Sequence, residues 1–197
     1  FKERFVIIIS LICIYVFSLL PNLYFDDYFG SYFDRVPEWV EVKDIVDPEF
    51  GSSFFTFADI ETNEPNGITN PEYLNKLDEF ENWLVQQESV ADVSTVSDVV
   101  KNLHKNMNGG LEEYYKIPDN KALIAQYFLM YEFSVPYGMD LKNQMTADKS
   151  SSRMLIRTNY STAIETVAFN KEVNLWIENN LEPFRTNGVA GIPIMMP

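Results

Sequence analysis

The chain has 197 residues, with 15 Lys and Arg against 29 Asp and Glu, and a formal net charge of −14. This length suffices for one domain with a hydrophobic core, and a negative field of this size repels phosphate backbones, which argues against nucleic-acid binding. The single cysteine, Cys13, lies in an apolar segment, so no disulfide can form within the chain. The chain begins at Phe1 and ends in an apolar run, residues 192–197, and we therefore expect it to be a piece of a longer protein.

The first segment of the chain has the pattern of a transmembrane helix. Residues 5–25 carry no charge and reach the roughly 20 residues that cross a bilayer. Lys2 and Arg4 precede this run and Asp26 and Asp27 come after it, so the positive-inside rule predicts a cytoplasmic N-terminus with the rest of the chain outside the cytoplasm. The bulky residues at the end of the run do not fit a cleavage site, and we therefore expect a retained anchor rather than a cleaved signal peptide.

Three Tyr-Phe pairs lie at the end of this run and just after it, at residues 24–25, 28–29 and 32–33. Their four-residue spacing places them on one face of a helix. Aromatic side chains of this kind favour the membrane–water interface, so the pairs form either an interfacial belt or an aromatic ledge that contacts a ligand. Residues 1–33 are therefore expected to form a transmembrane helix with an interfacial aromatic segment.

Residues 34–197 are expected to form one extracytoplasmic α+β domain. After a lead-in without a firm assignment, aromatic and β-branched runs predict strands, and apolar residues at three- and four-residue spacing predict helices. The elements expected in chain order are a strand over 52–58, a helix over 71–87, a strand over 90–96, a helical insertion over about 98–135, a strand over 153–159, a helix over 162–182 and a strand over 188–192.

Local signals mark where the helices of this domain begin. Asn70 can cap the helix over 71–87, with Pro71 at its first position. Within the insertion, Asp98 and Asp119 are the expected caps of two shorter helices. Without the insertion the order is βαββαβ, which predicts a ferredoxin-like, four-stranded antiparallel sheet with both long helices on one face.

The sequence shows no convincing catalytic or metal-binding pattern. It has no phosphate-binding glycine loop, and its only histidine, His104, is interpreted as a solvated residue of a polar helix rather than a zinc ligand. The acidic pairs at 26 and 27, 59 and 61, and 112 and 113 are expected in a chain this acidic and do not indicate a glycosidase. We therefore expect no enzymatic activity and no cofactor, and we assign no catalytic, cofactor-binding, metal or substrate-binding residue.

Methionine side chains offer one candidate for an adaptable apolar pocket. Met130, Met139 and Met145 lie in or just after the insertion. Flexible thioether side chains pack against varied ligands. Ordinary filling of the core is the alternative explanation.

Several segments, taken together and in order, resemble the N-terminal part of bacterial resistance-nodulation-division (RND) exporters. They are the segment at 21–29, the turn and helix start at 67–74 with the strand at 90–98, the helix end and loop at 127–138, 140–144 and 148–153, and the closing segment at 188–197. The similarity covers essentially the whole chain. It is to the branch of predicted exporters, also described as MMPL-like, which is related to hopanoid transporters and to eukaryotic sterol-sensing permeases.

This resemblance implies a function in transport. It implies proton-motive-force-driven efflux of hydrophobic or lipid-like molecules at the inner (plasma) membrane, with residues 34–197 forming the first porter domain outside the cytoplasm. The implied partners are the substrate, the remaining membrane helices and a second porter loop of the same chain, with a homo-oligomer as a further possibility. The proton-relay acids of that family lie on later membrane helices, so none is assigned here.

A second function class fits the same pattern of anchor and domain. A single-pass sensor or interaction domain would also carry one membrane helix and an acidic domain outside the cytoplasm. The sequence of the parent protein beyond Pro197 distinguishes the two classes, because an exporter requires further membrane helices and a second similar loop.

Overall fold

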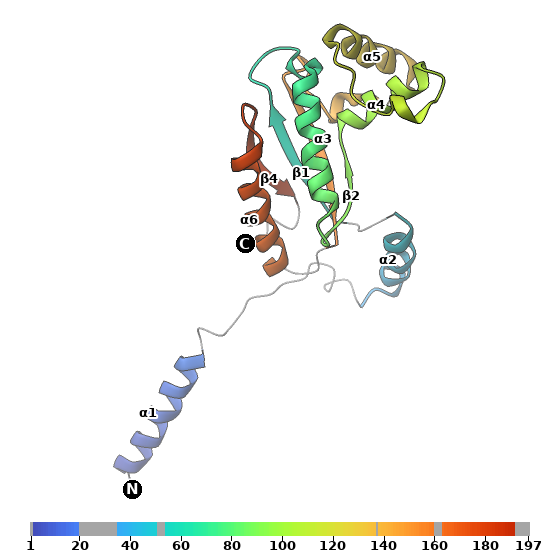
Figure 1. The fold of residues 1–197 in the computed structure, drawn as a ribbon. Coiled ribbons are helices and arrows are strands. Elements are labelled where there is room, and N and C mark those ends of the chain that lie inside the picture. Colours follow the sequence, from blue (N-terminus) through green and yellow to red (C-terminus); the bar gives the residue numbers. More distant parts are fainter. Residues whose placement is uncertain (1, 20–34, 51–53, 137, 160–162, 192–197) are drawn as a thin grey trace.

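The computed structural model describes residues 2–19, 35–136 except 51–53, 138–159 and 163–191 (Figure 1). The elements in chain order are helix α1 (Lys2–Leu19), helix α2 (Pro37–Phe50), strand β1 (Phe54–Glu61), the short 3₁₀ helix η3 (Gly67–Thr69), helix α3 (Pro71–Val85), strand β2 (Val90–Ser94), helix α4 (Val96–Met107), 3₁₀ helix η4 (Glu112–Tyr114), helix α5 (Lys121–Ser134), 3₁₀ helix η5 (Leu141–Asn143), strand β3 (Ser151–Thr158), helix α6 (Ala163–Asn180) and strand β4 (Arg185–Gly191).

Within the described residues, four strands form one sheet in the order β2-β3-β1-β4. Every neighbouring pair in it is antiparallel. The α+β class and the antiparallel sheet predicted from the sequence are thereby confirmed. The strand boundaries differ from the prediction: β1 runs on to Glu61 and β4 already begins at Arg185, because pairing between these two strands continues past the apolar residues that mark them in the sequence.

Helices α3 and α6 lie side by side on one face of the sheet (Figure 1). The inward residues of β3 alternate along the strand, with Met154 and Ile156 fully buried. From α3, the hydroxyl of Tyr73 lies 2.8 Å from the carbonyl oxygen of Ile60 and 2.7 Å from Ser152 Oγ, which joins the helix to both central strands. The core therefore lies between this face of the sheet and the two helices.

Helix α3 begins where the sequence predicts. The side chain of Asn70 accepts a hydrogen bond of 3.0 Å from the backbone N–H of Glu72, and Pro71 occupies the first turn. The residues that recur at three- and four-residue spacing are all buried: Tyr73, Leu74, Leu77, Phe80 and Leu84. A capped helix with one apolar stripe is held by burial of that stripe against the sheet.

The insertion between β2 and β3 is helical, as predicted, but both of its helices begin at different residues. Helix α4 starts at Val96, with Thr95 as its cap, and the carboxylate of Asp98 accepts from the N–H of Thr95 at 3.1 Å. Asp98 is thus the third residue of the helix, which is the other half of a capping box. Helix α5 is capped by Asn120 rather than Asp119.

The insertion packs against the main core rather than forming a core of its own. Ile124 and Phe128 of α5 are fully buried and belong to the same cluster of apolar residues as the sheet and α3. In Figure 1, α4 and α5 lie beside the upper part of α3, where β2 leads into the insertion.

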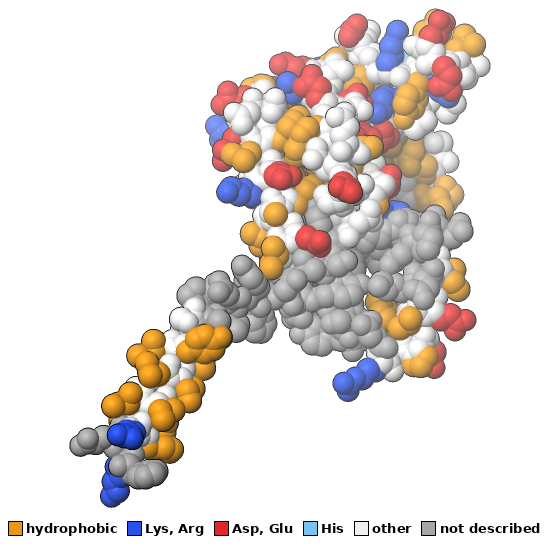
Figure 2. All heavy atoms as spheres, turned by 60° about the horizontal axis from the view of Figure 1, so that its bottom comes forward, with side chains coloured by type: hydrophobic (Ala, Val, Ile, Leu, Met, Phe, Trp, Pro, Cys, Tyr) orange, Lys and Arg blue, Asp and Glu red, His pale blue; other side chains and the backbone are white. Residues whose placement is uncertain are grey.

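In the described part of the chain, two helices precede the sheet. Helix α1 exposes apolar side chains along its length, from Phe5 to Phe17 (Figure 2). Among the described residues no helix combines the length and the hydropathy required to cross a bilayer. The three aromatic pairs predicted at the membrane interface lie outside the described residues, and α2 occupies most of the segment 34–51, to which no element was assigned from the sequence pattern.

Candidate substrate-binding cleft

A cleft of about 420 Å³ lies between the last turns of α5 and the segment 140–149 that leads into β3. Leu141, Met145 and Ala147 form the apolar part of its lining. Leu141 is 1% exposed and belongs to the hydrophobic core, while Met145 is half-buried and packs against that core. The apolar lining is therefore an extension of the core that reaches a cavity.

Backbone hydrogen bonds fix the segment that forms one wall of the cleft. The N–H of Arg153 donates to the carbonyl of Gln144 at 2.7 Å, which folds the segment back onto the start of β3. The N–H of Ile68 donates to the carbonyl of Lys149 at 3.1 Å, which ties the C-terminal end of the segment to the turn before α3. A wall held at two points favours a preformed cavity over one that forms only on binding.

The charged residues of the lining are paired with one another. Lys149 Nζ lies 3.1 Å from Glu132 Oε1, and Lys142 Nζ lies 2.7 Å from Asp140 Oδ2. The hydrogen bond between the second pair lowers the pKa of Asp140 and raises the pKa of Lys142 from their ordinary values. Two cations and two anions cancel, so the cleft suits an uncharged, largely apolar ligand better than a free ion.

A second cavity, of about 340 Å³, shares Met145 and part of the same segment and reaches the face of the sheet that α3 and α6 leave open. On that face the guanidinium of Arg153 forms a fork with Asp59, at 2.7 and 2.9 Å. Gln144 also lines this cavity, and its Oε1 is buried without a hydrogen-bond partner among the described residues. A buried acceptor of this kind is normally satisfied by a water molecule or a ligand donor.

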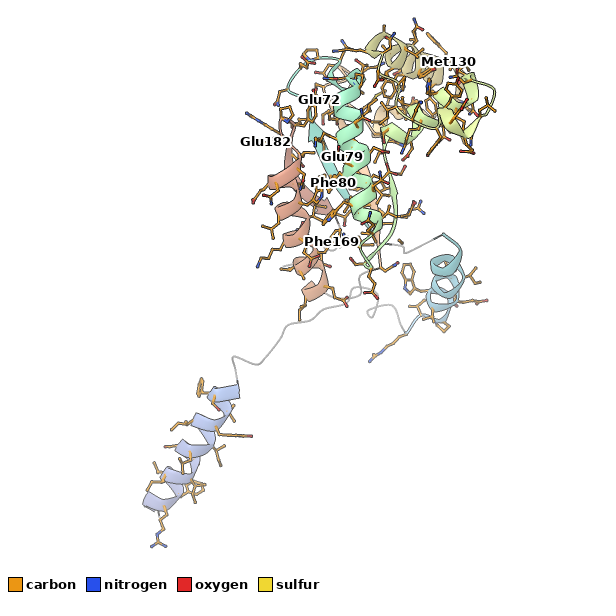
Figure 3. All side chains as sticks on the ribbon, viewed as in Figure 1. Glu72, Glu79, Phe80, Met130, Phe169 and Glu182 are labelled. Atoms are coloured by element: carbon orange, nitrogen blue, oxygen red, sulfur yellow. The ribbon has the colours of Figure 1, made fainter. Side chains whose placement is uncertain are left out.

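The three methionines proposed for a pocket lie in different surroundings. Met145 lines both cavities. Met130 packs against the hydrophobic core from α5 (Figure 3), and Met139 is 65% exposed. The structure therefore brings one of the three to the cleft.

The interpretation of His104 as a solvated residue is corrected. Its Nδ1 lies 3.0 Å from the hydroxyl of Tyr127, and its ring packs edge-on against Tyr114 at 5.6 Å. The histidine is half-buried and joins α4 to α5. The alternation of polar residues along α4 concealed this contact, because the partner lies on the next helix.

The acidic pairs are not brought together into a site. Asp59 is bound to Arg153 and exposed, and Glu61 is exposed at the end of the same strand. Glu112 forms an ion pair with Lys105, and residues 26 and 27 lie outside the described residues. Across the described part of the chain, no group of His, Cys, Asp and Glu side chains is arranged to hold a metal ion.

Apart from Met145, the residues that form the cleft were not identified as a site from the sequence. Residues 140–144 were noted as a segment that resembles a family, but nothing in their pattern shows that they fold against α5. The adjacency depends on the long-range pairing of the segment with β3, such as the bridge between Met145 and Ser152. Neither protein-family models nor curated proteins gave a match to this chain, so the site has to be interpreted from its own chemistry.

Proposed function

We propose that this chain is the N-terminal part of an RND-type membrane exporter, in which a membrane helix anchors a ferredoxin-like porter domain that handles hydrophobic or lipid-like molecules outside the cytoplasm. The observation that carries the proposal is the arrangement of the sheet. The strand order β2-β3-β1-β4, with α3 and α6 in the two crossovers, is the order of a ferredoxin-like βαββαβ unit.

The surface of α1 supports the membrane anchor. Its side chains from Phe5 to Phe17 are apolar around the whole helix apart from Ser10, and their exposed fractions run from 44% at Ile9 to 69% at Phe17. Exposing this much apolar area to water is costly, at roughly 25 cal/mol for each Å². A lipid environment removes that cost.

The negative charge of the domain argues against its direct binding to anionic lipid headgroups. Acidic side chains are spread over the part of the domain visible in Figure 2, and the chain as a whole carries a net charge of −14. Such a surface is repelled by anionic lipid headgroups. We therefore assign membrane attachment to α1 and ligand handling to the domain.

The cleft between α5 and residues 140–149 supports handling of an apolar molecule. Its lining joins the core, its charges are paired, and its volume of about 420 Å³ falls within the range of small-molecule sites. One porter loop supplies only part of a transport path in this proposal, so the isolated domain is expected to bind such a molecule weakly.

The cleft is tested by filling it in the complete protein. Met145→Trp places a larger side chain in the cavity and is expected to reduce the export of a hydrophobic dye such as Nile red from cells. Met107→Trp makes the same change on α4, at a residue that is 56% exposed and outside the lining, and is expected to leave export unchanged. Equal export by both variants would exclude this cleft from the substrate path.

The porter role itself is tested by deletion. Removal of residues 52–191 from the complete protein is expected to abolish export while membrane insertion is retained. Unchanged export would favour the single-pass sensor or interaction domain, and catalytic turnover by the domain would favour an anchored enzyme.

A further inference from the structure

A cluster of four charged side chains joins the insertion to α3. Lys101 of α4 is 8% exposed. Its Nζ lies 2.5 Å from Asp78 Oδ1, 2.9 Å from Asp98 Oδ1 and 3.7 Å from Glu81 Oε2. Asp78 and Glu81 belong to α3, so their contacts with Lys101 cross between the two helices, whereas the contact between Lys101 and Asp98 lies within α4.

Hydroxyl groups extend the cluster around Glu81. Thr95 Oγ1 lies 3.2 Å from Glu81 Oε2 and Ser97 Oγ lies 3.5 Å from the same oxygen, and each can donate to it. Both residues are buried at the junction of β2 and α4. Glu81 is thus held by groups that belong to the start of the insertion.

The cluster carries one positive charge against three carboxylates. Lys101 makes its two short contacts with Asp78 and Asp98, which leaves Glu81 with the longest of the three ion-pair distances. The Glu81 side chain is only 15% exposed, so solvent screens it poorly. Two like charges, Asp98 and Asp78, face it at the same time, and like charges in a shared site favour protonation of one member.

The geometry points to a proton-operated clasp, in which a neutral Glu81 fastens α4 to α3 and an ionised Glu81 loosens the attachment. The charged groups that face Glu81 are Asp78 on its own helix and Asp98 and Lys101 on α4. Lys105, one turn further along α4, lies with Lys101 over the ring of Tyr115 and is paired with Glu112. The clasp does not depend on the proposed transport function.

Glu81 is expected to change its protonation state near neutral pH. Burial and the neighbouring Asp98 raise the pKa of Glu81 to about 7, against the partial opposition of Lys101. A carboxyl group whose pKa is raised by folding binds its proton more tightly in the folded state. The clasp is therefore strongest at low pH, weakens as the pH rises from about 4.5 towards about 7, and weakens no further above that value.

The clasp is expected to affect the cleft, because one wall of the cleft belongs to the insertion. Helix α5 comes after α4, is joined to it by the contact between His104 and Tyr127, and supplies Glu132 to the cleft lining. Loosening α4 near neutral pH is expected to increase the mobility of that wall. Acidification would then favour the arrangement of α4 and α5 seen in the structure.

Hydrogen exchange of the full chain in detergent micelles tests the clasp. The protection of α4 amides, corrected for the intrinsic pH dependence of exchange, is expected to fall as the pH rises towards 7, by up to about tenfold for each pH unit, the limit for one linked proton. Glu81→Gln, which copies the neutral carboxyl group, is expected to show high protection at every pH. Glu79→Gln on the same helix, whose partner Lys76 lies outside the cluster, is expected to retain the pH dependence of the unchanged chain.

A second measurement holds even if Glu81→Gln fails to fold. The side-chain carboxyl carbon of Glu81, followed by NMR in the unchanged chain, is expected to titrate near pH 7. Titration at the ordinary glutamate pKa of about 4.5 would overturn the clasp. So would protection in α4 that falls with pH to the same extent in Glu81→Gln as in the unchanged chain.

Discussion

Phe80 of α3, labelled in Figure 3, stacks face to face with Trp176 of α6, with ring centroids 4.6 Å apart and 14° between the ring planes. Trp83 stacks on the same indole at 5.6 Å. Three aromatic rings therefore join the two long helices directly. This contact explains why both helices cover the same face of the sheet, since each alone would leave large aromatic surfaces exposed to water.

Truncation of the buried stack is expected to destabilise the domain strongly. Phe80 is fully buried, and Phe80→Ala should lower the free energy of unfolding by about 3–5 kcal/mol, with Leu77→Ala costing about 2–5 kcal/mol. Urea unfolding followed by circular dichroism measures both. Leu175→Ala on α6 is the control, because Leu175 is 51% exposed and its loss should cost within about 0.5 kcal/mol. Equal effects at the three residues would contradict the observed core.

Gly67 is predicted to be intolerant of any side chain. A Cβ at this residue would lie 2.0 Å from Thr62 Oγ1, and that hydroxyl donates to the carbonyl of Ser150 at 2.7 Å. Gly67→Ala must displace Thr62 and break the link between the turn before α3 and the start of β3. We expect a loss of about 1–3 kcal/mol in unfolding free energy. A melting temperature within 1 °C of the unchanged chain, on the order of the measurement error, would show that the turn accommodates a methyl group.

Asn120 and Asp119 are adjacent, but only Asn120 caps α5, so the two residues are expected to contribute differently to stability. The side chain of Asn120 accepts hydrogen bonds from the N–H groups of Ala122 and Leu123, at 2.9 and 3.2 Å. Asn120→Ala should therefore cost about 1 kcal/mol, whereas Asp119→Ala should change the stability by less than about 0.5 kcal/mol. The same urea titration distinguishes them. A larger cost at Asp119 would restore the cap predicted from the sequence.

The sequence predicted the elements whose signals are local. The three- and four-residue spacing from Tyr73 to Leu84 and the Asn70-Pro71 start indicate α3 without further information, and the alternation in β3 matches its buried face. Caps were less certain because polar residues cluster before each helix. Thr95 and Asp98, or Asp119 and Asn120, suit a cap equally well until the backbone conformation is known.

Features that depend on contact between distant segments could not be read from the sequence. The cleft requires α5 to lie against residues 140–149, and the charged cluster requires Asp78 and Lys101, 23 residues apart, to meet across two helices. Helix α2 was also missed. Its mixture of apolar and acidic residues has no clear period, so the pattern favours neither a helix nor a loop.

Removal of the cation from the charged cluster is predicted to be costly and pH-dependent. Lys101→Met leaves Asp78, Glu81 and Asp98 without a positive partner in a poorly solvated place, and breaking a buried ion pair in this way costs about 3–5 kcal/mol. Because protonation of the carboxylates removes their mutual repulsion, the loss should be largest above pH 7 and should shrink as the pH falls towards 4. Urea unfolding at several pH values measures this dependence.

The reference for that experiment is a lysine outside the cluster. Lys121 is 53% exposed in its side chain and lies 3.6 Å from Glu64. Lys121→Met should cost less than about 1 kcal/mol at every pH, as expected of an exposed ion pair. A pH-independent loss in Lys101→Met would show that the cluster contributes by its shape alone and not by its charge.

The proposed topology places α3 to β4 outside the cytoplasm, and cysteine labelling tests it. In a Cys13→Ser background, Glu113→Cys introduces a thiol at an exposed residue of the insertion. Because the run of residues 5–25 is expected to be retained in the membrane with acidic residues after it, a membrane-impermeant maleimide should label this thiol in intact cells, or in outer-membrane-permeabilised cells of a Gram-negative host. Lys2→Cys, on the opposite side of the apolar run, should be labelled only after lysis. Protection of Glu113→Cys together with labelling of Lys2→Cys would show the opposite orientation in the membrane. Labelling of both variants only after lysis would show that the domain does not lie outside the cytoplasm, and it would contradict the exporter proposal.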